Sequence, residues 1–389
     1  MKIIYFGTPG CSDNDFPLIK ALQEKGVDVY AFFYTNKITA HSCLFNITLF
    51  HEDKIVHMSK YKELEIYKSY LDMNNCYVIN NYHYGRRYWQ YWIMWIKVFL
   101  QMKRLNADLI HMTWPFERLQ KILYWLSQKK VLTVHDPIPH SSQRNGRNEK
   151  NRLLAFKKAQ GFVLLSTALL ESFCDSYHVD KDRICVNKMG WFDHLSLLTS
   201  KNDWVYQYKP FVLYFGQIQS HKGIDVLMKA MVEIHKTNPD VKLVVAGKGN
   251  FYFDLSPYDG LDYIKIINRY ITTDESASLF GNCLFAILPY LDATQSGVVQ
   301  TAFSLGTPLV VTNVGDLPIS VKDDIYGKVI PPNDVNSLVD VIRYLLDNPK
   351  LLLEYKNSIE NVWKKDQDWR PIADVYLNFY NRIVSEGKS

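Results

Sequence analysis

The sequence lacks any uninterrupted apolar run of the roughly 18 residues that a membrane-spanning helix needs. Its six cysteines are scattered along the chain, and none shows the two-residue spacing of metal-binding pairs. Zinc sites and disulfide frameworks depend on such clustered cysteines. We therefore expect neither a membrane span nor a zinc site, and we expect the thiols to be reduced.

The N-terminus, MKIIYFGTPG, does not have the layout of a secretory signal peptide, because its apolar run is short and leads directly into a turn. Low-complexity tracts and short-period repeats are also missing. The 389 residues are 47% hydrophobic and 22% charged, which is typical of a globular protein with two domains of ordinary size. A cytoplasmic protein is the expectation.

The net charge of +5 is unevenly distributed. Residues 1–200 contain 26 Lys and Arg against 18 Asp and Glu, which gives +8, whereas residues 201–389 contain 19 against 22, which gives −3. A basic first half is suited to anionic lipid, a phosphorylated substrate or nucleic acid. Lysines that are merely solvated explain the same bias.

Strand-like and helix-like segments alternate in two series, which predicts parallel sheets covered by helices on both faces. The first series begins with KIIYFG, and the second begins with FVLYFG after Pro210. The fold class is therefore α/β with two doubly wound, Rossmann-like domains. We place the first domain at residues 1–200 and the second at 205–367, with the boundary near 196–210.

Loops with unusual chemistry follow the predicted strands, where ligands of such sheets bind. They are GTPG, HDPIPH, GQIQSHKG, GKGN and LDATQSG. In the last of these, Thr294-Gln295-Ser296-Gly297 precedes an apolar helix. Small polar residues there cap a helix, and a glycine beside a helix N-terminus also lets backbone N–H groups approach a phosphate. The repeated placement at strand ends favours a ligand site.

Lys222 stands at the mouth of a predicted amphipathic helix, GIDVLMKAMVEIHKT, after a strand that ends in a glycine. A lysine in a loop is usually just solvated. In this position its ammonium group can reach a diphosphate, and the helix dipole supports the same negative charge. The pattern predicts an anion site.

The segments LYFGQIQSHKGIDVLMKAMVEIHKTNPDVKLVVAGKG and LFAILPYLDATQSGVVQTAFSLGTPLVVTNVGDLPISVKDDIYGKVIPPND resemble the nucleotide-sugar domain of glycosyltransferase family 4, which has the GT-B fold. The resemblance is specific over about residues 210–345 and only topological over 1–200. DWRPIADVYLNFYNRI resembles the last helices of the family, which implies that residues 368–389 pack back on the first domain.

The resemblance implies a retaining glycosyltransferase, a hexosyltransferase-type enzyme, that moves a sugar from a UDP- or GDP-linked donor to a glycan or a polyprenyl-diphosphate-linked acceptor. A role in assembly of bacterial surface polysaccharide follows from it, with the enzyme in the cytoplasm or peripheral on the inner face of the membrane. Neither a metal nor another cofactor is required in such enzymes, and nucleic acid is not a partner. The lack of a cluster with metal-ligand spacing agrees.

Carried over residue by residue, Gly216 matches the family's strand-end glycine and Lys222 its catalytic, phosphate-binding lysine. The family often has an arginine where this chain has Gln217, and Arg269 is a candidate replacement for that charge. The two glutamates common in the family are replaced by Ala293 and Thr301. The complete set of implied donor-binding residues is Gly10, Gly216, Gln217, Lys222, Gly247, Arg269, Thr294, Gln295, Ser296, Gly297, Val298 and Thr301.

In the first domain, Gly10 belongs to a turn that matches the family's glycine-rich turn, with Pro9 in place of one glycine. His135 ends a predicted strand and matches a family histidine near the reacting sugar, which makes it a catalytic candidate. A strand-end histidine also serves for packing or capping. Asp136, next to it, is placed either to orient the imidazole or to cap the following turn.

The segment YGRRYWQYWIMWIKVFLQMKR, residues 84–104, places Trp89, Trp92 and Trp95 at helical spacing between basic residues that include Arg86 and Arg87. Aromatic stripes at this spacing usually face a core. A tryptophan-rich basic helix is also suited to lie on an anionic membrane. Both interpretations hold together if the helix borders an acceptor entrance.

Two other functions remain open from the sequence. The replacements at 217, 293 and 301 are compatible with a non-catalytic GT-B partner subunit. A sugar phosphorylase or a nucleotide-sugar epimerase would share the fold. An intact Lys222 and the TQSG loop favour a bound diphosphate, and therefore sugar transfer.

Overall fold

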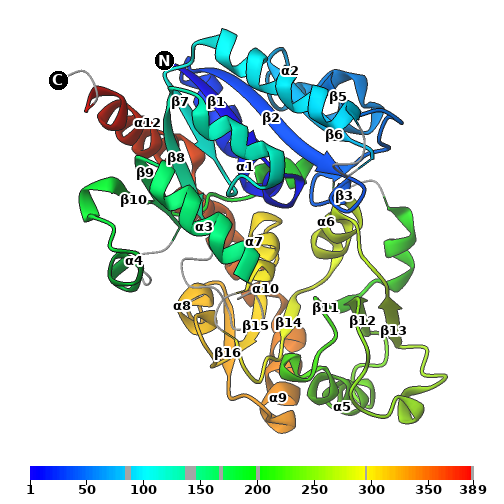
Figure 1. The fold of residues 1–389 in the computed structure, drawn as a ribbon. Coiled ribbons are helices and arrows are strands. Elements are labelled where there is room, and N and C mark those ends of the chain that lie inside the picture. The colour runs from blue at the N-terminus through cyan, green and yellow to red at the C-terminus, as the bar shows by residue number, and fades with distance from the viewer. Residues whose placement is uncertain (84–88, 136–145, 166–169, 199–201, 294–295, 387–389) are drawn as a thin grey trace. The chain divides into compact units, whose positions relative to one another are not determined.

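The computed structural model describes residues 1–83, 89–135, 146–165, 170–198, 202–293 and 296–386. The chain folds into two compact units (Figure 1). The first unit comprises Met1–Gly190 and Asp368–Ser389, and the second comprises Trp191–Gln367. Each unit contains a mainly parallel sheet with helices against it, so each is α/β and Rossmann-like.

The sheet of the first unit has the strand order β10-β9-β8-β7-β1-β2-β6-β5. All neighbouring pairs are parallel except β5 and β6, which are antiparallel. A short hairpin, β3 with β4, lies outside this sheet. The bounds are β1 Lys2–Gly7, β2 Asp28–Asn36, β3 His41–Ser42, β4 Phe45–Asn46, β5 Lys54–His57, β6 Cys76–Asn81, β7 Leu109–Met112, β8 Lys129–Val134, β9 Gly161–Leu164 and β10 Ile184–Val186.

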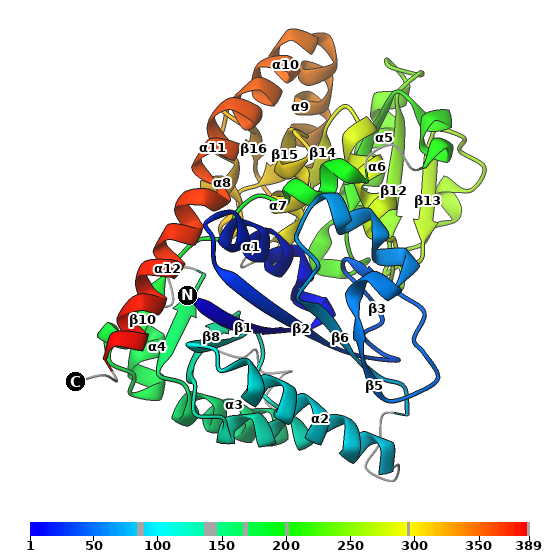
Figure 2. The same cartoon turned by 90° about the horizontal axis from the view of Figure 1, so that it is seen from above.

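The central strands of this sheet are apolar and buried, as expected when helices cover both faces. Ile4 and Phe6 of β1 pack in one core with residues of α2 and α3, and the alternate residue Tyr5 faces the other side. Figure 2 shows α2 and α3 on one face and α1 with α12 on the other. The helices are α1 Ser12–Glu24, α2 Trp89–Leu105, α3 Gly146–Lys158, α4 Leu170–Tyr177 and α12 Trp369–Ser385.

The C-terminal helix α12 is anchored in the first unit by polar contacts far apart in sequence. The Tyr380 hydroxyl lies 2.6 Å from Nδ1 of the buried His111 on β7. Nζ of Lys25 lies 2.6 Å from a carboxylate oxygen of Asp374. These contacts explain why residues after Asp368 belong to the same unit as residues 1–190.

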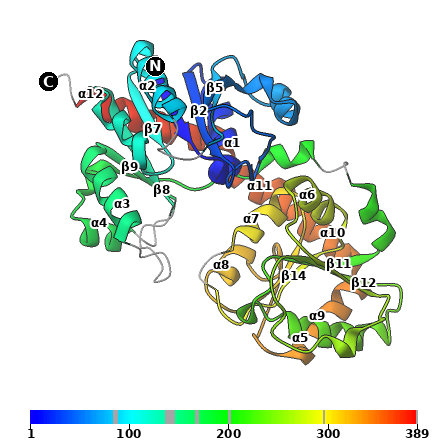
Figure 3. The same ribbon diagram turned by 45° about the vertical axis from the view of Figure 1, so that its right-hand side comes forward.

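The sheet of the second unit is entirely parallel, with the order β13-β12-β11-β14-β15-β16. Figure 3 shows α5 and α9 on one face of it and α6 with α7 on the other. The strands are β11 Phe211–Phe215, β12 Lys242–Gly247, β13 Ile264–Asn268, β14 Ala286–Leu288, β15 Leu309–Thr312 and β16 Gly327–Ile330. The helices are α5 Ile224–His235, α6 Thr273–Asn282, α7 Gly297–Ser304, α8 Leu317–Val321, α9 Val335–Asp347, α10 Pro349–Ser358 and α11 Lys364–Asp366.

The boundary between the units lies at Gly190, earlier than the position near 196–210 that the composition predicts. The reason is that the intervening residues pack on the second unit. The Phe192 amide donates to the Ser304 hydroxyl at 2.8 Å, and the Asn202 side chain donates to Asp274 at 3.2 Å. Val205 is fully buried in the core of the second unit.

The segment RLQKILYWLSQ, residues 118–128, has the apolar spacing of an amphipathic helix, and the helix that forms there is of the 3₁₀ type. Arg118–Trp125 is a 3₁₀ helix, η4, which begins with reciprocal contacts between Glu117 and Gln120. A 3₁₀ helix has three residues per turn, so residues three apart stack above one another. Gln120, Leu123 and Leu126 thereby form one buried ridge.

Candidate functional site

The candidate site is built from loops at the carboxyl ends of strands in the second unit. β11 ends at Phe215 and is followed by Gly216, whose amide donates to the Ala246 carbonyl oxygen at 3.0 Å. A β-carbon on Gly247, at the end of β12, would lie only 1.7 Å from the Gly216 carbonyl oxygen. These two predicted residues therefore lie in contact, and Gly247 must be glycine for the backbones to approach so closely.

The turn that presents Lys222 also depends on close approach between backbones. Ser220–Lys222 form one 3₁₀ turn, and Gly223 then adopts the left-handed conformation at φ +62° and begins α5. A β-carbon on Gly223 would lie 2.0 Å from the Pro289 carbonyl oxygen. The turn after β11 thus lies directly against the loop after β14.

Tyr290 joins the lysine to the TQSG loop, a connection that the sequence did not reveal. Nζ of Lys222 lies 3.6 Å from the centroid of the Tyr290 ring, within cation–π distance. The hydroxyl of the same tyrosine lies 3.4 Å from Oγ of Ser296. The Leu291 amide donates to the His221 carbonyl oxygen at 2.8 Å, which ties the two loops together.

The electrostatics of these loops favour an anion. Partial burial lowers the pKa of Lys222, and burial together with the neighbouring Lys222 lowers the pKa of His221. Ser296 precedes α7, whose first turn begins at the exposed Gly297 and presents the positive end of the helix dipole. A negatively charged ligand would relieve the cost of holding the lysine cation in a half-buried position.

The other predicted donor-site residues are placed less favourably for charge neutralisation. Arg269 makes two hydrogen bonds to the carboxylate of Glu275, at 2.8 and 2.6 Å, so its charge is already balanced. Gln217 is exposed and accepts from Gln219 at 3.0 Å. The Thr301 hydroxyl donates to the Gly297 carbonyl oxygen within α7, and Val298 lies partly buried in the first turn of that helix.

Part of the predicted set falls outside the described residues. Thr294 and Gln295 do so, as does Asp136 beside His135. His135 itself is half-buried directly after β8. Gly10 is exposed in the turn Pro9–Cys11, with open space around it. These two residues follow parallel strands of the first unit, as the pattern predicts.

A buried polar cluster around Asp15 of α1 follows the turn Pro9–Cys11. The carboxylate of Asp15 is fully buried and accepts hydrogen bonds from Tyr5 at 2.8 Å and from Thr113 at 3.4 Å. Burial raises the pKa of Asp15 well above its usual range. Burial also lowers the pKa of His111, which stacks on Tyr5, to about 3.

In the part of the chain that the structure describes, no three His, Cys, Asp or Glu side chains are grouped as metal ligands would be. No helix in the ranges that the structure describes combines the length and apolar character of a membrane span.

Residues 209–348 match the family model described as Glycosyl transferases group 1. An uncharacterised glycosyltransferase of Methanocaldococcus jannaschii is 24% identical over 233 residues, which cover 56% of this chain and 59% of the relative. A D-inositol 3-phosphate glycosyltransferase of Mycolicibacterium paratuberculosis is 27% identical over 187 residues, which cover 46% and 41%. The matches thus span about half the length of the relatives.

Solved structures resemble the chain over nearly its whole length. Sucrose-phosphate synthase from Thermosynechococcus elongatus has a TM-score of 0.62 at 17% identity and covers 99% of this chain and 100% of its own. Anabaena HepE in complex with UDP and glucose has a TM-score of 0.64 at 12% identity, with 98% and 100% covered. These similarities show the GT-B fold, in agreement with the fold class predicted from the sequence.

Proposed function

We propose that this chain is a glycosyltransferase that transfers a sugar from a UDP- or GDP-linked donor to a glycan or lipid-linked acceptor. The observation that carries the proposal is the meeting of Lys222, Tyr290 and Ser296 at the strand ends of the second unit. Residues 209–348, which match the glycosyltransferase family model, contain all three residues. The Anabaena relative in fold is described in complex with UDP-glucose, which supports a nucleotide-sugar donor.

In this proposal the donor diphosphate lies between the Lys222 ammonium group and the first turn of α7. Negative charge develops on the diphosphate as its bond to the sugar breaks. A fixed cation and preorganised backbone N–H groups at that position stabilise the transition state more than the ground state. The cation–π contact with Tyr290 holds the lysine in place.

We further propose retention of anomeric configuration without a covalent intermediate. The bond between the anomeric carbon and the diphosphate oxygen breaks, and the acceptor oxygen forms its bond to the same face of the sugar. The proton of the acceptor hydroxyl passes to the departing phosphate oxygen, which balances the step. No carboxylate occupies positions 293 or 301, where the family commonly has glutamates, so a nucleophilic acid is not part of the proposal.

We propose that the first unit binds the acceptor, with His135 near the reacting sugar and the backbone N–H of Gly10 close to the phosphate or the acceptor. Assembly of bacterial surface polysaccharide would supply a polyprenyl-diphosphate-linked acceptor and would place the enzyme on the inner face of the membrane. The charge of +8 on residues 1–200 supports a peripheral contact with anionic lipid. The reaction needs no metal in this account, so a chelator should leave turnover unchanged.

A non-catalytic partner subunit is the second candidate. It is favoured by Ala293 and Thr301 in place of two acids, and by the ion pair that occupies Arg269. A panel of UDP- and GDP-linked sugars separates the two functions, because a transferase both binds one donor and hydrolyses it slowly without an acceptor. Binding without hydrolysis or transfer would support the partner subunit, and binding of no nucleotide sugar would contradict both.

A further inference from the structure

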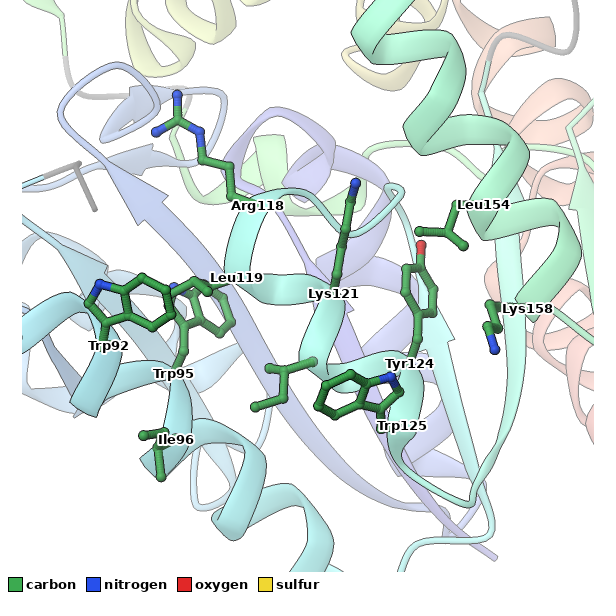
Figure 4. A pocket seen from close by; sticks show the side chains of 11 residues that line it. Trp92, Trp95, Ile96, Arg118, Leu119, Lys121, Tyr124, Trp125, Leu154 and Lys158 are labelled. Carbon is green, nitrogen blue, oxygen red and sulfur yellow. The ribbon is translucent and has the colours of Figure 1, made fainter. Parts of the chain in front are cut away.

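A groove of about 500 Å³ opens on the first unit between α2, η4 and α3 (Figure 4). Its walls are apolar and aromatic, and three cationic side chains border it. α2 contributes Trp92, Trp95 and Ile96, η4 contributes Arg118, Leu119, Lys121, Ile122, Tyr124 and Trp125, and α3 contributes Leu154 and Lys158.

The 3₁₀ conformation of η4 creates one wall of this groove. Because residues three apart stack in such a helix, Leu119, Ile122 and Trp125 form a second ridge beside the buried one, and all three line the groove. An α-helix would spread these positions around its axis. The groove therefore depends on a local conformation that hydrophobic spacing did not predict.

The tryptophans of α2 are divided between the core and this surface. Trp95 is 1% exposed and packs in the core, whereas Trp89 and Trp92 are 69% and 47% exposed. Trp125 on η4 is 78% exposed. Together with Ile96, these exposed side chains form what we call the aromatic face. Large apolar side chains gathered on one surface mark an interaction site.

The charges around the groove indicate an anionic occupant. None of the eleven lining residues is acidic. Among the described residues, neither Lys121 nor Lys158 takes part in an ion pair. Glu117, which precedes Arg118, is engaged in capping the first turn of η4. Figure 4 shows the Lys121 and Lys158 side chains above and beside the apolar walls.

We propose that the groove binds an anionic membrane lipid, with an acyl chain against its apolar walls and the headgroup near Lys121 and Lys158. Tryptophan prefers the boundary between headgroups and acyl chains, and lysine extends its charged end toward the headgroups, so the aromatic face suits that depth. The inference rests on the proposed function for one point alone, that the enzyme contacts the membrane. It adds the surface of the chain that makes this contact.

The test is co-flotation of the full chain with phosphatidylcholine vesicles that contain or lack phosphatidylglycerol, at low and high salt. We expect binding only to the anionic vesicles, and release by salt. Lys121→Gln with Lys158→Gln should weaken binding by about fivefold for each lysine. The matched control, Lys60→Gln with Lys62→Gln, changes two exposed lysines elsewhere on the same unit and should have no effect.

A second pair of variants tests occupation of the groove. Leu154→Trp fills the groove without a change of charge, and it should weaken binding to anionic vesicles by about tenfold, as loss of apolar burial would. Leu353→Trp, at a leucine that is 58% exposed on the second unit, is its control and should bind normally. Equal binding of Leu154→Trp and the wild type would contradict the proposal.

Each groove variant should still bind the nucleotide sugar. A measurement of this binding therefore distinguishes failure of the inference from failure of the proposed function. The inference would be overturned if the chain did not bind vesicles at low salt, or bound equally to vesicles without anionic lipid. It would also be overturned if light scattering showed an oligomer of the wild type that the groove variants do not form. The last outcome would assign the groove to a contact between copies of the chain.

Discussion

The ammonium group of Lys222 lies 3.6 Å from the centroid of the buried Tyr290 ring, and the hydroxyl of that ring reaches Ser296. One aromatic side chain therefore positions a cation and the start of a helix that lie far apart in sequence. A cation and a helix start that are fixed in this way would require little reorganisation to stabilise a departing anion. The proposed donor site depends on this contact between Lys222 and Tyr290.

Two substitutions of Tyr290 separate the contact of its ring with Lys222 from the contact of its hydroxyl with Ser296. Tyr290→Leu removes the cation–π contact, and the KM for the donor should rise by roughly 2- to 30-fold, the range expected from about 0.5–2 kcal/mol. Tyr290→Phe keeps the ring and should change KM by less than about threefold. Steady-state kinetics measure the KM of both variants, and circular dichroism verifies that they fold. Equal KM values for the two variants would contradict the positioning role.

The lowered pKa of Lys222 predicts how activity depends on alkaline pH. Burial favours the neutral amine, so the cation is lost at a lower pH than in a solvated lysine. Because kcat/KM reports the pKa values of the free enzyme, kcat/KM for the donor should decrease with increasing pH below about 10.5, the usual lysine value. In Lys222→Arg the side chain stays charged, so the decrease should move to higher pH even if the maximal rate is lower. If the decrease occurred at the same pH in Lys222→Arg and in the wild type, a cationic role for Lys222 would be contradicted.

Gly223 and Gly260 form a matched pair for the turn before α5. Both have positive φ, at +62° and +77°, but a β-carbon would strike the Pro289 carbonyl only at Gly223. Gly260→Ala should destabilise the protein by about 1 kcal/mol through backbone strain alone. Gly223→Ala should cost at least about 2 kcal/mol more, because packed backbones must separate. Urea denaturation measures both, and equal costs would show that the turn is not closely packed.

Asp15 predicts a pH dependence of stability. Its folded pKa is raised above the unfolded value of 3.8, so the folded state retains a proton that the unfolded state has lost. Stability is therefore lost as pH rises between these two values. Asp15→Asn removes that loss, so the stability of the variant relative to the wild type should increase by up to about 1.4 kcal/mol per pH unit in that window.

Urea denaturation of the wild type and Asp15→Asn at about pH 5 and about pH 7 provides the measurement. Other groups near Asp15, among them Tyr5, His111 and Asp13, are common to both proteins, so their titration largely cancels in the difference. A difference that does not change with pH would show that Asp15 is ionised in the folded protein.

Much of the architecture follows from hydrophobic patterns, because parallel strands buried on both faces leave short apolar runs such as FVLYFG and VKLVVAG. Glycines 216 and 247 could be placed at strand ends for the same reason, and Lys222 could be placed at the start of the helix after the first of these strands. Tyr290 could not be assigned, since a tyrosine after a buried strand is equally suited to packing. Its role depends on two loops that meet only in the fold.

The groove could not be predicted from the sequence, for a different reason. Whether residues 118–125 form an α- or a 3₁₀ helix depends on local contacts, such as the hydrogen bond from the Phe116 amide to the Tyr124 hydroxyl at 3.1 Å. Hydrophobic spacing over eight residues does not distinguish the two periods. The spacing of the tryptophans of α2 likewise fits either a core-facing or a membrane-facing stripe. The structure places Trp95 in the core and Trp89 with Trp92 on the surface.

The central claim is that Lys222 stabilises the departing diphosphate of a nucleotide sugar. Its most direct test is the turnover of Lys222→Ala with the donor that the wild type uses, compared with Lys229→Ala, a change of an exposed lysine on α5, the helix that follows the turn of Lys222. Loss of a preorganised electrostatic donor should lower turnover by about a hundredfold or more. Lys229→Ala should remain close to the wild type, whereas near-normal turnover of Lys222→Ala would contradict the account.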